Sequence, residues 1–239
     1  MATTAKFVAH RGSFPTAPGV RALANIVKAC PASVATPKEG TDGTKYLYST
    51  ERCIVIPDAF PKSTVHFLVI PRDPNLVCLN SLTSAHCDLL QHMMEVADTV
   101  TNRMKSENAD YANLRYISGF HAIPSLPQLH MHRLSMDLES DRLKNKKHYN
   151  TFASYFFLPA EQILADLKAH GHVTMNQDVD RFHALEKGDM KCLWCGLPLA
   201  GMPMMKSHVP SCEKNMARIE RSEKVAKRRA VGEGKGLDG

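Results

Sequence analysis

Residues 121–132 read His-Ala-Ile-Pro-Ser-Leu-Pro-Gln-Leu-His-Met-His. Side chains alternate along an extended strand, so His130 and His132 share one face of their strand, while the apolar residues beside them point to the other face. The prolines within residues 124–127 predict a turn before this strand. A strand that precedes the turn would return antiparallel and carry His121 toward His130. The segment therefore predicts two antiparallel strands that bring three imidazole rings together.

Imidazole rings suit chemistry on a phosphate, because an unperturbed pKa of roughly 6.5 lets a ring attack as a free base or donate a proton as its conjugate acid. Two alternating histidines are also compatible with a metal site or with an ordinary half-buried strand. The spacing alone does not distinguish these three interpretations.

Short runs of β-forming residues and several helical patterns surround this segment. Strands are predicted over residues 46–49, 53–56, 65–70, 114–120 and 128–135. Helices are predicted over residues 20–29, 84–104 and 159–169, with Ser84 as the N-cap of the second and Gly171 beyond the end of the third. Strands interrupted by one long helix, without a regular βαβ alternation, favour an α+β domain with an antiparallel sheet.

The composition favours one main globular domain with a small appended module. The chain has 239 residues, of which 44% are hydrophobic, enough for a full core. A formal net charge of +6 favours a polyanionic partner. No apolar stretch approaches the roughly 20 residues that span a bilayer, and residues 1–18 lack the apolar centre of a signal peptide. We therefore expect no membrane partner and no secretion.

The seven cysteines are odd in number and unevenly spaced, which argues against a disulfide framework and favours a reducing compartment. Cys192 and Cys195 are separated by two residues, and twelve residues later His208 and Cys212 are separated by three, which is zinc-ligand spacing. Four such ligands leave no open coordination position, so the predicted zinc is structural. It would supply folding free energy that so short a segment lacks. Coincidental spacing is the alternative.

The predicted organisation has four parts. Residues 1–44 form an arm with one helix, residues 45–172 the main domain, residues 173–218 the zinc-finger module, and residues 219–239 a basic, disordered tail. The apolar side of the helix in the arm docks on the domain in the simpler interpretation. The basic residues near the end form a solvated surface or a nuclear import signal.

The chain also contains the segments IPDAFPK (56–62), GFHAIPS (119–125), QLHMHR (128–133) and LKNKKHYN (143–150). Together they resemble the aprataxin branch of the histidine-triad superfamily, over roughly residues 45–215, and the combination is far more specific than any one segment. Three positions depart from the family's pattern. Gln128 stands in place of the first histidine of the triad, Arg133 in place of an apolar residue, and Cys212 in place of a second histidine in the finger.

The resemblance implies a histidine-triad catalytic domain with an antiparallel sheet and helices, followed by a zinc finger that binds DNA without sequence specificity. It implies a nuclear DNA-repair hydrolase that removes AMP from 5′-adenylated DNA ends, the products of abortive ligation, through a covalent histidine–AMP intermediate. The expected partner is DNA with nicked or 5′-adenylated ends, and the expected form is a monomer. The chain resembles a fungal form without the N-terminal phosphopeptide-binding domain of animal aprataxins. The helix in the arm then resembles a wedge that packs against the DNA end.

The resemblance also implies the roles of individual histidines. His130 is the nucleophile, His132 binds the phosphate in flight, and His121 stabilises or protonates the leaving 5′-phosphate. No metal takes part in this chemistry. His66, inside a predicted strand, is interpreted as a structural histidine.

Further residues are expected to contact the substrate. They are Asp58 on the ribose, Lys62 and Ser125 on the phosphates, Gln128 as the orienting residue and Lys144 on the DNA backbone. Apart from the resemblance, Asp58 and Ser125 are ordinary turn residues, Lys62 is an exposed loop lysine, and Lys144 belongs to a solvated basic loop.

Two other functions remain open. A general histidine-triad nucleotide hydrolase or transferase would use the same His130 on a small AMP conjugate, and it would have no need of the finger. A non-catalytic protein that binds DNA ends is favoured by Gln128, which would mark a decayed triad. Against this, a glutamine amide both donates and accepts hydrogen bonds, so it can still orient its neighbours.

Overall fold

The computed structural model describes residues 22–30, 38–40 and 43–212, and its centre is an antiparallel sheet of six strands. The strands lie in the order β3 (Tyr48–Ser49), β4 (Cys53–Pro57), β5 (His66–Pro71), β7 (Met131–Ser135), β6 (Tyr116–His121) and β8 (Phe157–Pro159). A separate pair consists of β1 (Lys38–Glu39) and β2 (Lys45–Tyr46). Every pairing in the six-stranded sheet is antiparallel, which confirms the predicted α+β class.

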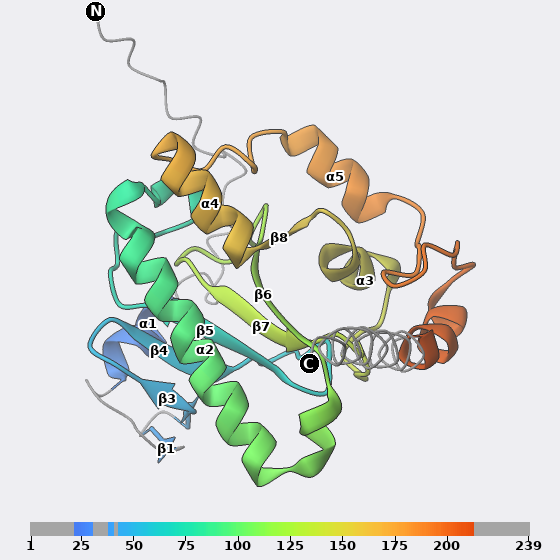
Figure 1. Cartoon of the computed structure of the whole chain (residues 1–239), viewed down its shortest axis with the longest axis horizontal. Helices are drawn as coiled ribbons and strands as arrows, with labels where there is room; N and C mark the ends of the chain where they lie inside the picture. Colours follow the sequence, from blue (N-terminus) through green and yellow to red (C-terminus); the bar gives the residue numbers. More distant parts are fainter. Residues whose placement is uncertain (1–21, 31–37, 41–42, 213–239) are drawn as a thin grey trace, which may run out of the picture.

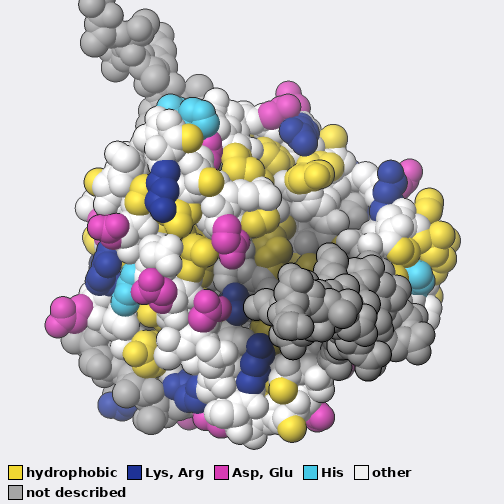
Figure 2. Space-filling view, viewed as in Figure 1, with side chains coloured by type: hydrophobic (Ala, Val, Ile, Leu, Met, Phe, Trp, Pro, Cys, Tyr) yellow, Lys and Arg dark blue, Asp and Glu magenta, His cyan; other side chains and the backbone are white. Residues whose placement is uncertain are grey.

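Two helices, α2 (Cys87–Glu107) and α4 (Ala160–His170), cover one face of the sheet (Figure 1). Alternate strand residues supply the apolar surface beneath them, and Val55, Val69 and Met131 belong to this cluster. On the outside, acidic and basic side chains are interspersed over these helices (Figure 2). Among the described residues visible in this view, the basic side chains are mixed with acidic ones and do not gather into one patch.

The opposite face of the sheet carries two separate apolar clusters. In the first, α1 (Ala22–Ala29) packs against β4 and β5, and its buried Leu23 and Val27 meet Ile54. The helix predicted over residues 20–29 is confirmed where the structure describes it.

In the second cluster, α3 (Lys146–Ala153) and the region of the predicted finger share one core. Tyr149 of α3 and Phe157 of β8 are buried together with Met205. The helix that precedes the finger, α5 (Val179–Lys187), also contacts α3. The finger is therefore packed against the sheet and does not stand apart from it.

The strand surface between these two clusters carries histidines. His66 of β5, His121 of β6 and His132 of β7 occupy positions that alternate with residues of the α2 face. Gly119 keeps this surface open, because a Cβ at that position would lie 2.5 Å from the ring of Phe157. The missing side chain lets Phe157 cross β6 and approach His121, with ring centroids 6.2 Å apart.

The boundaries of the two central strands differ from the prediction. β7 begins at Met131, and the prediction that it begins at residue 128 is wrong, because Gln128 has φ of 79°. A left-handed residue interrupts the extended backbone, so the alternation of side chains does not reach Gln128. β6 ends at His121, one residue later than predicted.

Helix α2 begins at Cys87, so the prediction of Ser84 as its N-cap is wrong. Ser84 opens a short 3₁₀ turn, and the preceding Thr83 donates its backbone N–H to Nδ1 of His86. The prediction for α4 is confirmed, because Gly171 adopts φ of 76° and ends the helix in the left-handed conformation. The short 3₁₀ turns are η1 (Leu79–Ser81), η2 (Ser84–His86) and η3 (Ala109–Asn113).

One interpretation predicted that the basic segment after Leu143 is a loop. The structure shows that only its beginning is a loop. α3 begins at Lys146, and the side chain of Asn145 caps it by accepting the backbone N–H of His148. Residues that a loop would leave mobile are thereby fixed on the first turn of a packed helix.

Within the described residues, no helix combines the length and the apolar character needed to cross a membrane. Predictions for residues 1–21, 31–37, 41–42 and 213–239 lie outside the described residues. These include most of the arm, the tail and the import signal.

Candidate active site and zinc cluster

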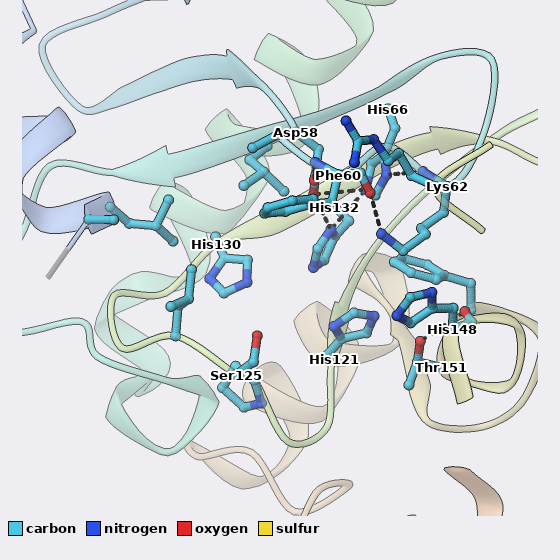
Figure 3. Close-up of a pocket in the computed structure, with 18 of the residues that line it drawn as sticks. Asp58, Phe60, Lys62, His66, His121, Ser125, His130, His132, His148 and Thr151 are labelled. Atoms are coloured by element: carbon cyan, nitrogen blue, oxygen red, sulfur yellow. Dashed lines mark hydrogen bonds and ion pairs between the residues drawn. The ribbon is translucent and has the colours of Figure 1, made fainter. Parts of the chain in front are cut away.

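A cavity of about 1160 Å³ opens in the gap between the two apolar clusters, and Figure 3 shows its polar residues. At one end α1 lines it together with apolar strand and turn residues, which include Ile26, Ile56, Leu68 and Leu126. At the other end it is basic, and α3 and the segment before it contribute Arg142, Lys144, Lys147 and His148. The histidines lie in the same cavity, between an apolar and a basic end.

His130 presents one ring nitrogen as a free base. Its Nδ1 lies 2.8 Å from the backbone carbonyl oxygen of Gln128, and since a carbonyl only accepts, Nδ1 carries the proton. In a neutral ring Nε2 then keeps its lone pair. Burial lowers the pKa of His130, although the Gln128 carbonyl and Asp58 act in the opposite direction. This arrangement suits Nε2 to attack on phosphorus.

A chain of hydrogen bonds fixes the tautomer of His132. The backbone N–H of Lys62 donates to Nδ1 of His66 over 3.0 Å, so a neutral His66 carries its proton on Nε2. That Nε2 lies 3.0 Å from Nδ1 of His132 and donates to it. A neutral His132 must then carry its own proton on Nε2. The chain therefore makes Nε2 of His132 a hydrogen-bond donor.

His121 stands beside His132, with ring centroids 4.4 Å apart, and aromatic rings enclose it. Phe152 and Phe156 meet it edge-on at centroid distances of 4.6 and 5.5 Å. Nε2 of His121 and Nε2 of His132 are buried and have no hydrogen-bond partner among the described residues. Because unpartnered buried polar atoms are costly, this pair indicates a ligand with acceptor oxygens, such as a phosphate.

Burial keeps these rings neutral at physiological pH. Burial is the main cause, and together with the charges of His130 and Lys62 it lowers the pKa of His66 to about 4, against the effect of Asp58, and the pKa of His121 to about 3. The pKa of His132 is held well below its usual value by burial and by the other three rings. The free-base form of the cluster is therefore stable at pH 7.

We expect the free energy of unfolding to fall as the pH decreases from about 6.5 to about 4. Unfolded histidines titrate near 6.5, whereas folded His66 titrates near 4, so the unfolded chain binds more protons in this window. Urea unfolding between pH 7 and pH 4 measures the effect. His66→Gln should reduce the pH dependence, and the same change at the exposed His172 should not. An unfolding free energy that is constant over this range would contradict the neutral cluster.

The loop after β4 brings two predicted substrate contacts to the cavity. Oδ2 of Asp58 lies 3.5 Å from Nε2 of His66 and 3.8 Å from Nδ1 of His132. The ammonium group of Lys62 donates to the carbonyl oxygen of Phe60, and burial lowers its pKa, against the effect of Asp58. Both Asp58 and Lys62 line the cavity.

Ser125 and Lys144 also line the cavity, from the turn after β6 and from the segment before α3. The backbone N–H of Lys144 donates to Nδ1 of His148 over 3.3 Å. His148, a weaker candidate for a DNA contact in the same basic segment, also lines the basic end.

Of the predicted substrate contacts, Gln128 is the one that does not line the cavity. Its side chain is buried, and its amide nitrogen donates to the carbonyl oxygens of Pro71 at 3.0 Å and Asp73 at 3.2 Å. The contact that orients His130 comes from the backbone carbonyl of Gln128. A backbone contact does not depend on the side chain, so a glutamine at this position leaves it intact.

Arg133 lies on the opposite face of the sheet, where its guanidinium group is fully engaged. It donates to Thr101 at 3.1 Å, to Ser118 at 3.0 Å and to Asp98 at 2.8 Å, and it lies over the ring of Tyr116. These partners on α2 and β6 explain a charged residue at an apolar position of the family's pattern.

His66 is the residue whose role the sequence analysis missed. Position alternation within its own strand could have placed it on one face, but only the pairing of Leu68 with His132 brings the two histidines together. Phe152 was also missed, because it reaches His66 and His132 from a helix, with centroids 5.4 Å apart in both cases.

His66→Ala should lower kcat for the reaction that the resemblance implies about 10- to 100-fold, the scale on which loss of a hydrogen-bond partner acts at a metal-ligating histidine. Without the Nε2 donor of His66, His132 can move its proton to Nδ1 and lose the donor that faces the ligand. His66→Gln keeps an amide donor and should recover part of the loss. Equal rates for the alanine variant and the wild type would contradict this role.

A second interpretation of this cluster is a metal site. Asp58, His66 and His132 offer donor atoms within 4.8 Å of one another. The tautomer argues against it, because Nε2 of His66 carries a proton and bonds to His132, so its lone pair is not available to an ion. We therefore assign the cluster to hydrogen bonding.

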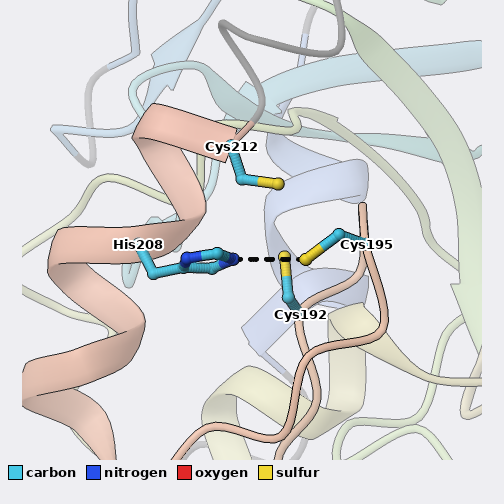
Figure 4. A group of neighbouring side chains, drawn as sticks. All are labelled: Cys192, Cys195, His208 and Cys212. Carbon is cyan, nitrogen blue, oxygen red and sulfur yellow. Dashed lines mark hydrogen bonds between the residues drawn. The ribbon is translucent and has the colours of Figure 1, made fainter.

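The four predicted zinc ligands lie together (Figure 4). The donor atoms of Cys192, Cys195, His208 and Cys212 all lie within 4.8 Å of one another. Gly196, with φ of 74°, closes the turn after the first pair by donating its N–H to the carbonyl oxygen of Cys192. A Cys₃His set with this clustering fits tetrahedral Zn²⁺.

The sulfur atoms of this cluster differ in acidity. Burial and the neighbouring sulfurs raise the pKa of Cys212 to about 12. The backbone N–H of Leu197 and the ring of His208 lower the pKa of Cys195 to about 7. Zn²⁺ binds thiolates, so its charge would offset the repulsion among them.

Hydrogen bonds join the finger to α3. The hydroxyl group of Tyr149 donates to the carbonyl oxygen of Lys191 at 2.9 Å and accepts the N–H of Leu193 at 3.2 Å, on either side of the ligand Cys192. The buried amide of Asn150 donates to the carbonyl oxygen of Gly188 at 2.9 Å. The helix that lines the basic end of the cavity is thus tied to the zinc cluster.

Two protein-family models match the chain. Residues 35–148 match the family described as "Scavenger mRNA decapping enzyme C-term binding", and residues 153–214 match the "C2HE / C2H2 / C2HC zinc-binding finger". The second match begins before β8, so it includes a strand of the central sheet. The chain therefore carries a zinc-binding finger.

Known relatives cover most of the described residues. Aprataxin of Gallus gallus is 36% identical over 68% of this chain and 49% of its own length, and an aprataxin-like protein of Schizosaccharomyces pombe is 30% identical over 63% of this chain and 66% of its length. The crystal structure of the aprataxin ortholog Hnt3 in complex with DNA superposes with a TM-score of 0.57 at 25% identity, over 70% of this chain and 86% of that chain. The chain spans about half the length of the vertebrate relatives it matches. Because relatives named aprataxin or aprataxin-like are 30–36% identical over about two thirds of this chain, and the two family models match the segments of the histidine cavity and of the finger, the chain belongs to the aprataxin family.

Proposed function

We propose that the protein hydrolyses 5′-adenylated DNA ends, releasing AMP and restoring a 5′-phosphate. One observation carries the proposal: the free-base Nε2 of His130 shares a cavity with two buried ring nitrogens, on His121 and His132, that have no partner among the described residues. A phosphate between them would meet a nucleophile and hydrogen-bonding groups at once. The relatives named aprataxin, and the ortholog solved with DNA, support the substrate class.

In the first step, Nε2 of His130 attacks the phosphorus atom of the adenylate. A nitrogen–phosphorus bond forms, the bond from phosphorus to the bridging oxygen breaks, and its electron pair leaves with the 5′-phosphate of the DNA. The positive charge that develops on the ring is stabilised by the carbonyl oxygen of Gln128, which accepts from Nδ1. The product is a covalent histidine–AMP intermediate.

His132 and His121 stabilise the negative charge that shifts between the oxygens. The Nε2–H of His132 donates to a non-bridging oxygen of the adenylate. His121 assists the leaving 5′-phosphate, and its pKa of about 3 in the free protein means that it starts neutral. An entering polyanion raises that pKa, and a phosphate monoester with a second pKa near 6 leaves without full protonation. Stabilisation is therefore favoured over proton transfer for His121.

In the second step, water attacks the phosphorus atom of the intermediate. The nitrogen–phosphorus bond breaks, its electron pair returns to Nε2 of His130, the hydroxyl group stays on AMP and a proton is released to solvent. No metal enters either step, because the histidines and Lys62 supply the stabilising groups.

The nucleic acid is assigned to the basic end of the cavity and to the finger. Arg142, Lys144 and Lys147 line that end, and Lys206 lies on the finger helix close to the zinc ligands. Such contacts read phosphates and not bases, so binding without sequence specificity follows. The zinc has four protein ligands and no open position, so its role is structural. We propose a monomer that acts in the nucleus.

A second candidate is hydrolysis of small AMP conjugates, which the apolar end of the same cavity favours because it suits a nucleoside regardless of the leaving group. A non-catalytic DNA-end binding protein is a weaker candidate, because the tautomers of His130 and His132 are set for reaction.

Release of AMP from a nicked duplex with a 5′-adenylated end, measured without added divalent metal, tests the proposal. The comparison substrate is a small phosphoramidate of AMP. A much higher kcat/KM on the duplex supports the DNA-repair function, and a preference for the small conjugate supports the second candidate. If the folded, zinc-loaded protein releases no AMP from either substrate, the proposed hydrolase activity is wrong.

A further inference from the structure

Phe60 is an exposed aromatic residue at the cavity. Its side chain is 62% exposed, and it lines the cavity from the loop after β4. Single exposed apolar side chains are common on protein surfaces, so exposure alone carries no inference. The inference rests instead on the position of the ring, on its rigid backbone and on its charged neighbours.

The loop that carries Phe60 is held on both sides. The N–H of Phe60 donates to Oδ1 of Asp58 over 2.7 Å, and its carbonyl oxygen accepts from the ammonium group of Lys62. The N–H of Lys62 is bonded to His66, and the carbonyl oxygen of Pro61 accepts from a serine hydroxyl group. An exposed ring on a fixed backbone loses little conformational entropy when a partner stacks on it.

Two cations lie over the ring of Phe60. Nζ of Lys62 is 5.9 Å from its centroid, and the guanidinium carbon of Arg142 is 6.0 Å away. An aromatic face beside positive charge is the combination with which proteins bind single-stranded nucleic acid, where the ring stacks on a base and the cations neutralise the phosphates. In Figure 3, Asp58, Phe60 and Lys62 follow one another along one side of the cavity, across from His121 and Ser125.

The position of Phe60 selects which base it meets. The apolar end of the cavity, beside α1, suits the adenosine of the substrate, whereas Arg142 belongs to the basic end. Because Arg142 lies over the ring, Phe60 stands on the side from which the leaving strand departs. We propose that Phe60 stacks on the base of the 5′-terminal nucleotide of the DNA and holds it away from its neighbour in the duplex. This inference rests on the proposed function for the identity of the strand.

A fluorescent base tests the contact directly. 2-Aminopurine is placed at the 5′-terminal nucleotide of adenylated, nicked DNA, and binding is measured with His130→Ala protein, so that no turnover intervenes. In a duplex the neighbouring bases already quench 2-aminopurine, so a base held away from its neighbour should become brighter on binding, and Phe60→Ala should abolish this change. Phe60→Tyr, which keeps an aromatic face, should restore it. Tyr155→Ala is the matched control, because Tyr155 is 70% exposed and does not line the cavity.

Steady-state kinetics give a second readout. Base–aromatic stacking of ordinary strength corresponds to a rise of about 5- to 150-fold in KM for the adenylated duplex in Phe60→Ala. The rise in KM for the small phosphoramidate of AMP should be at least about five times smaller. Equal rises for both substrates would show that Phe60 contacts the adenosine and would overturn the proposal.

Failure of this inference is distinguishable from failure of the proposed function. A fluorescence change that persists in Phe60→Ala, or that depends on Phe60 only when the fluorophore replaces the adenine of AMP, overturns the stacking proposal while AMP release by the wild type still stands. Absence of AMP release by the wild type overturns the proposed function, whatever the fluorescence shows.

Discussion

Replacing His130 with alanine should abolish release of AMP from 5′-adenylated DNA, with a loss in kcat on the order of 10⁴-fold or more, the scale on which removal of an enzyme nucleophile acts. The reason is the single free-base nitrogen that His130 presents to the cavity, fixed by the bond from Nδ1 to the Gln128 carbonyl. His132 cannot replace it, because Nδ1 of His132 is occupied by the bond from His66. The measurement is single-turnover release of AMP from the nicked duplex.

The intermediate gives an independent check on His130. Rapid quenching of the wild-type reaction in alkaline denaturant, which preserves a nitrogen–phosphorus bond that acid would hydrolyse, should trap AMP on the protein, and peptide mapping at alkaline pH should locate it on His130. His172→Ala is the control, because His172 is exposed and outside the cavity. Both variants should unfold at the temperature of the wild type to within a few degrees. A loss of less than about tenfold in His130→Ala would assign the nucleophile to another residue.

Removal of the zinc should destabilise the whole protein and not only its finger. Structural zinc contributes about 10–16 kcal/mol of apparent binding free energy in isolated finger peptides. Here the ligand Cys192 is 3% exposed, in one core with Tyr149 and Phe157. When the ligands separate, this core and the hydrogen bonds of Tyr149 to the finger are lost together.

The effect should reach the cavity through α3, because Phe152 of that helix packs on His121 and His132. Cys192→Ser, or exhaustive dialysis against a chelator, should therefore lower the rate on the small AMP conjugate as well as on DNA. Thermal unfolding and metal content are measured on the same samples. Cys87→Ser is the matched control, because Cys87 is half-buried and outside the zinc cluster.

The outcomes separate two roles for the finger. A finger that only binds DNA would leave hydrolysis of the small conjugate unchanged after the zinc is removed, and that result would contradict the coupling through α3. A parallel loss on both substrates, with a lower unfolding temperature, would agree with the shared core. The DNA-binding role itself is measured by the salt dependence of affinity for the duplex.

Local patterns were sufficient for much of the site. The alternation of His130, Met131 and His132 predicted that the two histidines share a face, and both line the cavity although β7 begins only at Met131. The spacing from Cys192 to Cys212 predicted the zinc ligands, because a tetrahedral ion constrains nearby residues on a knuckle and a helix. The predicted α+β class was confirmed as well, because the hydrophobic periods that distinguish strands from helices can be recognised within short segments of sequence.

Other features could not be predicted locally, because they depend on contacts between residues far apart in the chain. The left-handed backbone of Gln128 and its bonds to Pro71 and Asp73 belong to a neighbouring turn, so no strand pattern contains them. The sequence offered no partner for the charge of Arg133, whereas in the structure α2 provides Thr101 and Asp98 as hydrogen-bond acceptors.

The sequence by itself determined which groups are assigned to the chemistry and to the metal, namely His130 with His132 and a Cys₃His set, because both sets follow from the spacing of covalently linked residues. The tertiary structure decided what those groups can do. His66 sets the tautomer of His132 across two strands, and Tyr149 ties the finger to the helix that lines the cavity. Tautomers, burial and shared cores depend on the register of strands and on the packing of helices, which no local pattern specifies.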